Sequence, residues 1–224
     1  LIFYIHKSKP NSMKTLYLLI VILTFHASCE AQVSLKWAKR FGGASNDYGY
    51  SIAVDASGNV YNAGFFGGIS DFDPGASVFN LTSNGSWDIF ITKQDSSGNL
   101  QWAKSIGGSS YDQAYGIAID SSDNVYVTGW FTGTVDFNPS GAVSNLTSNG
   151  GFDGFILKLD ASGNYVWAKS FGGIDNDVGY GIAVDAQNNV YATGYFSGTA
   201  DFDPSASSFN LTSLGYQDIF SLKL

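Results

Sequence analysis

An aspartate and a tyrosine three residues apart recur at three places, each 65 residues after the last. A tyrosine offers a flat apolar face for a sugar ring, and a carboxylate accepts hydrogen bonds from sugar hydroxyls. If the protein binds a ligand such as a glycan, the residues predicted to hold it are Asp47, Tyr50, Asp112, Tyr115, Asp177 and Tyr180. The sequence also allows, and favours, a structural role in which the aspartate caps a turn and the tyrosine packs between sheets.

A second repeated pattern, Asp-Phe-Asp/Asn-Pro, carries two oxygen-bearing side chains at alternate positions. Side chains two residues apart share a face of an extended segment, so both oxygens could meet one hard cation such as calcium. The predicted metal residues are Asp71, Asp73, Asp136, Asn138, Asp201 and Asp203. Asp and Asn before Pro are also ordinary turn initiators, and a full calcium loop presents more than two ligands. Apart from calcium, we expect no cofactor.

Paired carboxylates are also the catalytic groups of glycosidases. Catalytic residues are normally unique in a chain, whereas these pairs come three times over. We therefore expect a scaffold and no enzyme, with an Asp-based glycan-processing enzyme as the less favoured alternative.

Two tryptophans break the repeat. Trp87 stands where another copy has Phe152, and Trp130 stands where another copy has Phe65. Such departures are candidates for ligand specificity, so both tryptophans join the predicted ligand-binding residues, although random drift explains them equally well.

Composition excludes several other chemistries. Cys29, Glu30, His6 and His26 are the only residues of their types, and all precede residue 32. The chain beyond them therefore cannot form a Ser-His-Asp triad, a cysteine nucleophile or a His/Cys zinc site. It retains 8 Lys and Arg against 18 Asp, a net charge of about −10. This charge argues against nucleic acid or an anionic membrane as a partner.

The first 31 residues are interpreted as a leader. Residues 1–12 precede the first methionine and are taken as upstream read-through or an incomplete start. Residues 13–31 are predicted to be a signal peptide, because a lysine precedes an apolar run that is too short to span a membrane. Lipidation at Cys29 is the less favoured alternative to simple cleavage of the signal peptide. We expect a secreted or outer-cell-surface protein, with no transmembrane span after cleavage.

The elements that must position these residues are strands. Ser51–Gly64 recurs at 116–129 and at 181–194, with the 65-residue offset unbroken. The copies are placed at about 33–97, 98–162 and 163–224 within a repeat region of 32–224. Alternating apolar residues predict four strands per copy, at 50–55, 60–66, 88–94 and 100–106 in the first. Repeated units of four antiparallel strands predict an all-β fold, a β-propeller built from three 65-residue repeats.

The turn between the first two strands of each copy offers an internal check. Its third position is Gly58, then Asp123, then Asn188. These are the residue types that best tolerate a left-handed backbone. We therefore predict a positive φ at all three positions.

The sequence resembles a known family, the secreted bacterial SBBP-repeat proteins, whose name reflects a β-propeller. The residues that carry the resemblance are Trp102-Ala-Lys104, the run at 117–129, and Phe155-Ile-Leu-Lys-Leu-Asp160. The resemblance covers nearly all of the chain after residue 34. It implies an exported surface or extracellular protein and supplies no catalytic motif to transfer.

The two ends of the repeat region bear on ring closure. The repeat region is predicted to begin, at Leu35–Phe41, with a strand equivalent to the fourth strand of a copy. It is predicted to end, at Asp218–Leu224, with a strand equivalent to the third strand of a copy. Propellers usually have at least four blades, so the chain is interpreted as a fragment of a larger ring. Two alternatives stay open: residues 35–41 close a small three-unit ring, or the open edges pair with a second chain.

The predicted topology divides the loops between two faces. The short turns share one face and the long connections share the other, which is the expected binding face. The first functional hypothesis is a secreted or surface binding or adhesion scaffold whose partner is an extracellular glycan or protein. The alternative is a structural repeat region that displays a further domain.

Overall fold

The computed structural model describes residues 33–205 and 207–224; the predicted leader at 1–31 lies outside them. Within these residues the fold is all-β, with eighteen strands, no helix and antiparallel pairing throughout the sheets. Lys36–Leu224 form one structural unit. Strands of mostly seven residues alternate with Gly-, Asn- and Asp-rich turns, as the sequence predicts.

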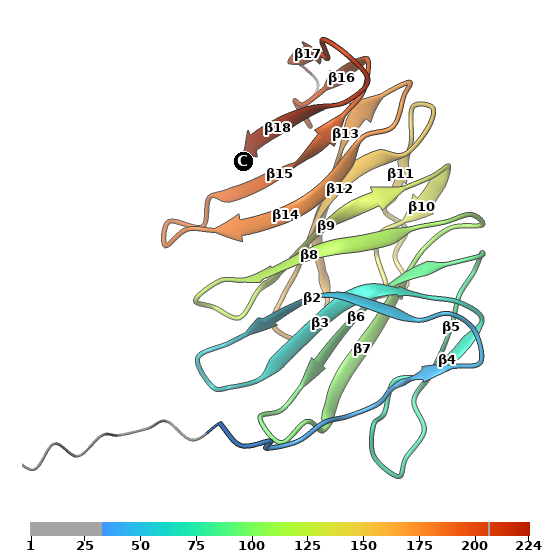
Figure 1. Ribbon diagram of the computed structural model, residues 1–224, viewed down its shortest axis with the longest axis vertical. Helices are drawn as coiled ribbons and strands as arrows, with labels where there is room; N and C mark the ends of the chain where they lie inside the picture. The colour runs from blue at the N-terminus through green and yellow to red at the C-terminus, as the bar shows by residue number, and fades with distance from the viewer. Residues whose placement is uncertain (1–32, 206) are drawn as a thin grey trace, which may run out of the picture. The chain divides into compact units, whose positions relative to one another are not determined.

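Three larger sheets follow one another along the chain (Figure 1). The first sheet has the order β2-β3-β6-β7, with strands Tyr48–Val54, Val60–Phe66, Asp88–Gln94 and Leu100–Ile106. Three of these strands have the predicted bounds, and β2 begins two residues earlier and ends one residue earlier than predicted. The second sheet has the order β8-β9-β12-β13, with strands Gln113–Ile119, Val125–Phe131, Asp153–Leu159 and Tyr165–Gly173. The third sheet has the order β14-β15-β18, with strands Val178–Val184, Val190–Phe196 and Asp218–Lys223.

The turns between the first two strands of each sheet have the predicted geometry. The φ angle is +80° at Gly58, +61° at Asp123 and +65° at Asn188. In the first turn, the Asp55 carboxylate accepts the backbone N–H groups of Ser57 and Asn59, both at 2.9 Å. Burial alone raises the pKa of Asp55, but its hydrogen bonds outweigh this and hold the pKa below its usual range. The prediction of left-handed residues is therefore confirmed.

Each long connection contains a short hairpin, which is not among the four strands predicted per copy. The hairpin strands are β4 and β5, β10 and β11, and β16 and β17, at Ile69–Asp71, Asn80–Thr82, Thr134–Asp136, Asn145–Thr147, Thr199–Asp201 and Asn210–Thr212. The first hairpin pairs with β1 (Gly42–Gly43), and the last pairs with the end of β13, which joins it to the second sheet. Strands of three residues are too short to show an alternating pattern of apolar residues.

The predicted strand at Leu35–Phe41 is wrong, because residues 33–41 form no strand and pairing begins only at β1. The equivalent strands β7 and β13 each pair with the strand before them, β6 and β12. The described chain has no strand before residue 42, so this segment lacks the neighbour that would complete a ladder.

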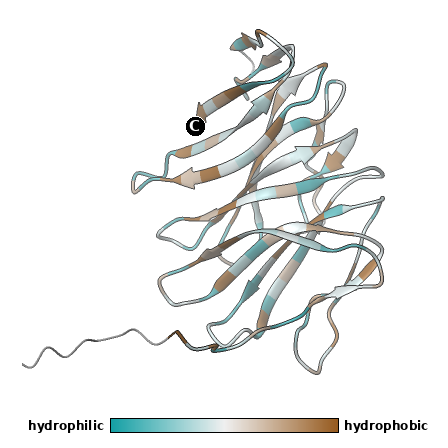
Figure 2. Ribbon diagram, in the orientation of Figure 1, coloured by the Kyte–Doolittle hydropathy of each residue, from teal (hydrophilic) through white to brown (hydrophobic). Residues whose placement is uncertain are grey.

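The sheets pack face to face through hydrophobic side chains. One cluster joins Tyr61 and Ile91 of the first sheet to Ile117 and Val127 of the second. Another joins the second sheet to the third. Figure 2 shows hydrophobic stretches along the strands and a hydrophilic turn between β14 and β15. The two middle strands of the second sheet, β9 and β12, are covered on both sides, so their burial is nearly continuous and not alternating.

The first strands of the three sheets, β2, β8 and β14, lie side by side with β8 in the middle (Figure 1). The β2–β3, β8–β9 and β14–β15 turns lie at one side of the unit, at the left in Figure 1, and hairpins β4–β5 and β10–β11 lie at the other. No helix in the part of the chain that the structure describes is long and apolar enough to cross a membrane.

Candidate functional site

The three predicted tyrosines sit on β-bulges. In the β2–β3 pair, Gly49 lies opposite Gly64 and Ser51 lies opposite Ala63, so Tyr50 has no partner of its own. The register shifts in the same way around Tyr115 and Tyr180. A bulge re-aims the side chain of its extra residue, and bulges are common next to functional sites.

Because β2, β8 and β14 are neighbours, the bulges bring the three tyrosines into one row, which we call the tyrosine ladder. The ring centroids are 4.8 Å apart between Tyr50 and Tyr115 and 5.1 Å apart between Tyr115 and Tyr180. Tyr50 is 49% exposed and Tyr180 is 51% exposed. Burial, together with the neighbouring tyrosines, raises the pKa of both outer hydroxyls, so they stay neutral donors at physiological pH. The ladder is thus a half-exposed aromatic surface with hydroxyl groups along it.

The central tyrosine is held in place by hydrogen bonds. Its hydroxyl donates to Gln113 Oε1 at 2.8 Å and accepts the indole N–H of Trp130 at 3.3 Å. Trp130 itself is 7% exposed. Its contribution to the candidate site is therefore to orient Tyr115.

The two tryptophans that break the repeat occupy the same kind of place. The Phe65 and Trp87 rings stack at 4.6 Å, and the Trp130 and Phe152 rings stack at 4.1 Å. In the first sheet the tryptophan lies just before the third strand, and in the second sheet it lies on the second strand. Each pair keeps one Trp and one Phe. Shared packing therefore accounts for both departures from the repeat.

The predicted aspartates lie behind the tyrosines and hold the loops that lead to them. In each case the backbone N–H of the glycine four residues earlier donates to the aspartate Oδ2 at 2.7 Å. Asp112 and Asp177 are fully buried, whereas Asp47 is half-buried. Burial raises the pKa of Asp112 and of Asp177 to about 6. The geometry places all three carboxylates in the loop-capping role that the sequence favours and buries those of Asp112 and Asp177.

The predicted calcium residues form turns within the hairpin connections. Asp71 Oδ1 accepts the backbone N–H of Asp73 at 3.0 Å and that of Phe79 at 2.8 Å. Asp136 and Asp201 make the matching bonds, and Asp73, Asn138 and Asp203 each accept a further backbone N–H. Hydrogen bonds from Phe79 and Asp73 hold the pKa of Asp71 below its usual range. No group of three or more candidate metal ligands occurs among the described residues, and calcium binding stays a prediction.

Sequence reasoning missed two buried carboxyl groups. Asp88 and Asp153 open β6 and β12, are fully buried, and each have an Oδ1 without a hydrogen-bond partner among the described residues. Burial and the nearby charge of Asp177 raise the pKa of Asp153 to about 7. An acidic residue at the start of an otherwise apolar strand was the available signal.

The family comparison covers the segments that carry the first two ladder tyrosines. A family model described as the SBBP beta-propeller repeat matches residues 36–64 and 101–133. The chain contains SBBP repeats. Each matched segment runs through the first two strands of a sheet, β2–β3 or β8–β9, so each includes a bulged tyrosine of the ladder.

Two curated proteins are similar to this chain over most of its length. The uncharacterized WD repeat-containing protein L264 of Acanthamoeba polyphaga mimivirus is 29% identical over 189 residues, which are 74% of this chain and 14% of that protein. The regulatory protein FlaEY of Caulobacter vibrioides is 28% identical over 164 residues, which are 70% of this chain and 16% of that protein. The chain spans about a seventh of the length of these relatives.

Proposed function

We propose that the chain is a binding or adhesion scaffold, and that the tyrosine ladder is its contact surface for a glycan. The observation that carries this proposal is the alignment of three bulged tyrosines on neighbouring strands, two of them half exposed. Neighbouring tyrosines offer flat apolar faces and hydroxyl groups together, which suits the CH face and the hydroxyls of a sugar. Secretion or display on the outer cell surface is part of the same proposal.

The test is a glycan array probed with the purified chain and with a Tyr50→Ala/Tyr180→Ala double variant. Both side chains are half exposed, so their loss should leave the fold intact. Phe209→Ala is the matched control, because Phe209 is an exposed aromatic on the connection between β16 and β17. We expect the double variant to lose binding and the control to keep it. Equal binding by the double variant would refute the proposal that the ladder is the contact surface for the glycan.

We further propose that the chain does not catalyse a reaction. The repeated carboxylates serve as acceptors for backbone N–H groups, which leaves them poorly placed to act as a general acid and base. The check is hydrolysis of a broad glycan panel. Turnover that Asp136→Asn alone abolishes would establish the enzyme alternative instead.

The same scaffold is proposed to self-associate through the edge of β18. β18 pairs with β15, and no strand pairs along its other edge in the described chain. Residues 36–43 have the Trp-Ala-Lys sequence of β7 and β13. Phe41 contacts Phe90 of the first sheet, and the equivalent Phe171 of β13 contacts Phe220 of the third sheet. Residues 36–43 therefore lie against the first sheet in the way that β13 lies against the third. This segment of a second copy is therefore the proposed fourth strand beside β18.

Light scattering tests this association. Ala38→Pro removes a backbone N–H from the segment and should yield monomers, whereas Ser34→Pro, which lies before the segment, should associate like the unchanged chain. A monomeric unchanged chain at tens of micromolar would rule out the self-association.

A further inference from the structure

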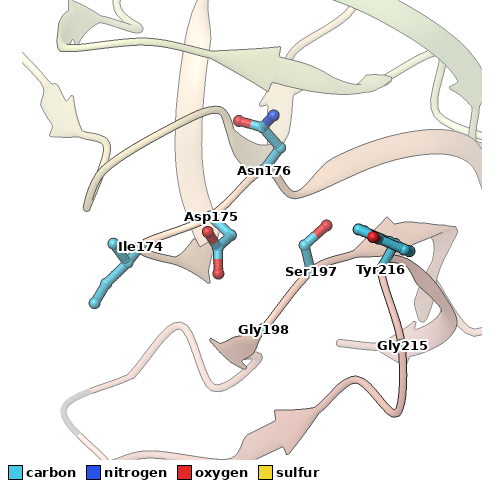
Figure 3. A pocket seen from close by; sticks show the side chains of 7 residues that line it. All are labelled: Ile174, Asp175, Asn176, Ser197, Gly198, Gly215 and Tyr216. Atoms are coloured by element: carbon cyan, nitrogen blue, oxygen red, sulfur yellow. The ribbon is translucent and has the colours of Figure 1, made fainter.

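A pocket of about 450 Å³ opens beside the third sheet (Figure 3). Its walls come from the loop between β13 and β14, the start of the β15–β16 connection, and the segment before β18. The lining residues are Ile174, Asp175, Asn176, Ser197, Gly198, Gly215 and Tyr216. This volume lies within the usual range for small-ligand sites.

The polar groups of this pocket are free to bind. The Asp175 carboxylate, the Ser197 hydroxyl and the Asn176 Nδ2 make no hydrogen bond within the part of the chain that the structure describes. Asn176 Oδ1 accepts the backbone N–H of Phe152 at 3.1 Å, and the NH₂ group of the same amide remains available as a donor. The pocket therefore presents an acceptor, a donor, and a hydroxyl that does both.

Tyr216 supplies an aromatic face. Its side chain is 97% exposed, and its ring lies across the open space from Asp175 (Figure 3). Ile174, which is 80% exposed, adds an apolar edge. An aromatic ring beside convergent polar groups is the arrangement that recognises a pyranose, whose CH face stacks while its hydroxyls exchange hydrogen bonds.

Four of the seven pocket residues differ from both of their counterparts in the chain: Ile174, Asp175, Ser197 and Tyr216. Ile174-Asp175-Asn176 replaces Ser109-Ser110-Tyr111 of the second copy, and Tyr216 stands where the other copies have Ser86 and Gly151. The difference falls on a 65-residue pattern that is otherwise closely kept, and it adds a carboxylate and an aromatic ring to one loop cluster. The glycine at position 198, which every copy keeps, leaves room for this carboxylate, because a Cβ there would overlap Asp175 Oδ2.

We propose that this pocket is a binding site for one neutral pyranose unit of a glycan, with Tyr216 stacking on the sugar and Asp175, Asn176 and Ser197 bonding to its hydroxyls. The proposal rests on the glycan-binding function proposed above and adds a second contact to the ladder. Asp175 and the acidic chain disfavour anionic sugars. A single sugar unit of about twelve heavy atoms should bind with a Kd on the order of millimolar.

The experiment is saturation-transfer NMR of the whole chain with the methyl glycosides of glucose, galactose, mannose and N-acetylglucosamine. Tyr216→Ala and Asp175→Asn should each weaken binding by about tenfold or more, and Tyr216→Phe should keep it because the stacking face remains. Tyr111→Ala, in the equivalent loop before β8, is the matched control and should bind normally. Melting curves confirm that each variant is folded.

The outcomes separate the two proposals. Binding that survives Tyr216→Ala and Asp175→Asn, yet is lost in the ladder double variant, overturns the pocket and leaves the glycan function standing. Failure of the unchanged chain to bind any of the four glycosides overturns this site as a pyranose site, while a positive glycan array would still uphold the ladder. A lysine-rich peptide that binds in place of the sugars, and is lost in the same variants, would reassign the pocket to basic side chains.

Discussion

Asp153→Asn should stabilise the protein above neutral pH, because the wild-type carboxyl is buried beside a second one. Asp153 and Asp177 are both fully buried and approach the same glycine. A Cβ on Gly172 would lie 2.8 Å from Asp153 Cγ and 2.9 Å from Asp177 Oδ2. Neither carboxyl has a cationic partner within the described residues, where the one ion pair joins Lys93 to Asp55. Ionising both carboxyls is therefore costly.

The sign and size of the effect follow from the pKa. The folded-state pKa of Asp153 is raised from 3.8 to about 7, first by burial and then by Asp177. The stability that the neutral Asp153 carboxyl contributes is therefore fully present below pH 3.8 and is lost as the pH rises through about 7. A rise of roughly three pKa units corresponds to at most about 4 kcal/mol at high pH. Relaxation around the charge reduces this bound, so we expect about 3 kcal/mol, or roughly 6–12 °C in Tm for a domain of this size.

The assay is a series of thermal melts between pH 4 and pH 8.5 on the unchanged chain and the variant. The two Tm values should nearly coincide at pH 4 and diverge as the pH rises, with Asp153→Asn higher. Asp160→Asn is the control. Burial raises the pKa of Asp160, but hydrogen bonds from Asn164 and Ser162 outweigh this and hold it below the usual range. This control should be less stable than the unchanged chain across the whole pH series, because a lowered pKa contributes stability at every pH above 3.8.

A difference in Tm that stays constant across this pH range would refute the reasoning, because it would mean that Asp153 does not titrate there. A variant that is less stable at pH 8.5 would refute it too, since the carboxylate would then be a favourable charge.

Three further outcomes are expected. Phe137→Ala should lower the free energy of unfolding in urea by about 3–5 kcal/mol, since the ring is fully buried in the core; a loss below about 1 kcal/mol would contradict this packing. Asp123→Gly should be nearly neutral and Asp123→Ala should cost about 1 kcal/mol by the same assay, because φ is +61° there; equal stability of the two variants would count against the left-handed turn. Trp130→Phe and Phe152→Trp should each destabilise alone and partly compensate when combined, as contacting residues do; simple additivity in a double-mutant cycle would argue that the stacked pair is not a unit.

Some elements follow from local chemistry and could be predicted. Strands β3, β6 and β7 have the predicted bounds, because apolar residues in these runs are bracketed by Gly-, Asn- and Asp-rich turns. The left-handed turn residues were predictable because the preference of Gly, Asn and Asp for positive φ is intrinsic to the residue. The SBBP resemblance could be recognised because its motifs are also local in the sequence. The family match at 36–64 and 101–133 bears it out.

Other features depend on partners distant in the chain. The bulge at Tyr50 exists only relative to β3, so no pattern within β2 reveals it. Residues 36–41 have a strand sequence yet form no strand, because a ladder needs a neighbour. The seven pocket residues come from three segments, and nothing local in the sequence joins them.

The sequence by itself determined an all-β repeat architecture, the positions of the main strands and turns, and the absence of cysteine, histidine and glutamate chemistry beyond residue 31. Tertiary structure decided which of the repeated polar residues meet solvent. The tyrosines were turned outward by bulges and the aspartates Asp112 and Asp177 were buried behind them. The physical reason is that strand and turn preferences act over a few residues, whereas exposure depends on how whole sheets pack against each other.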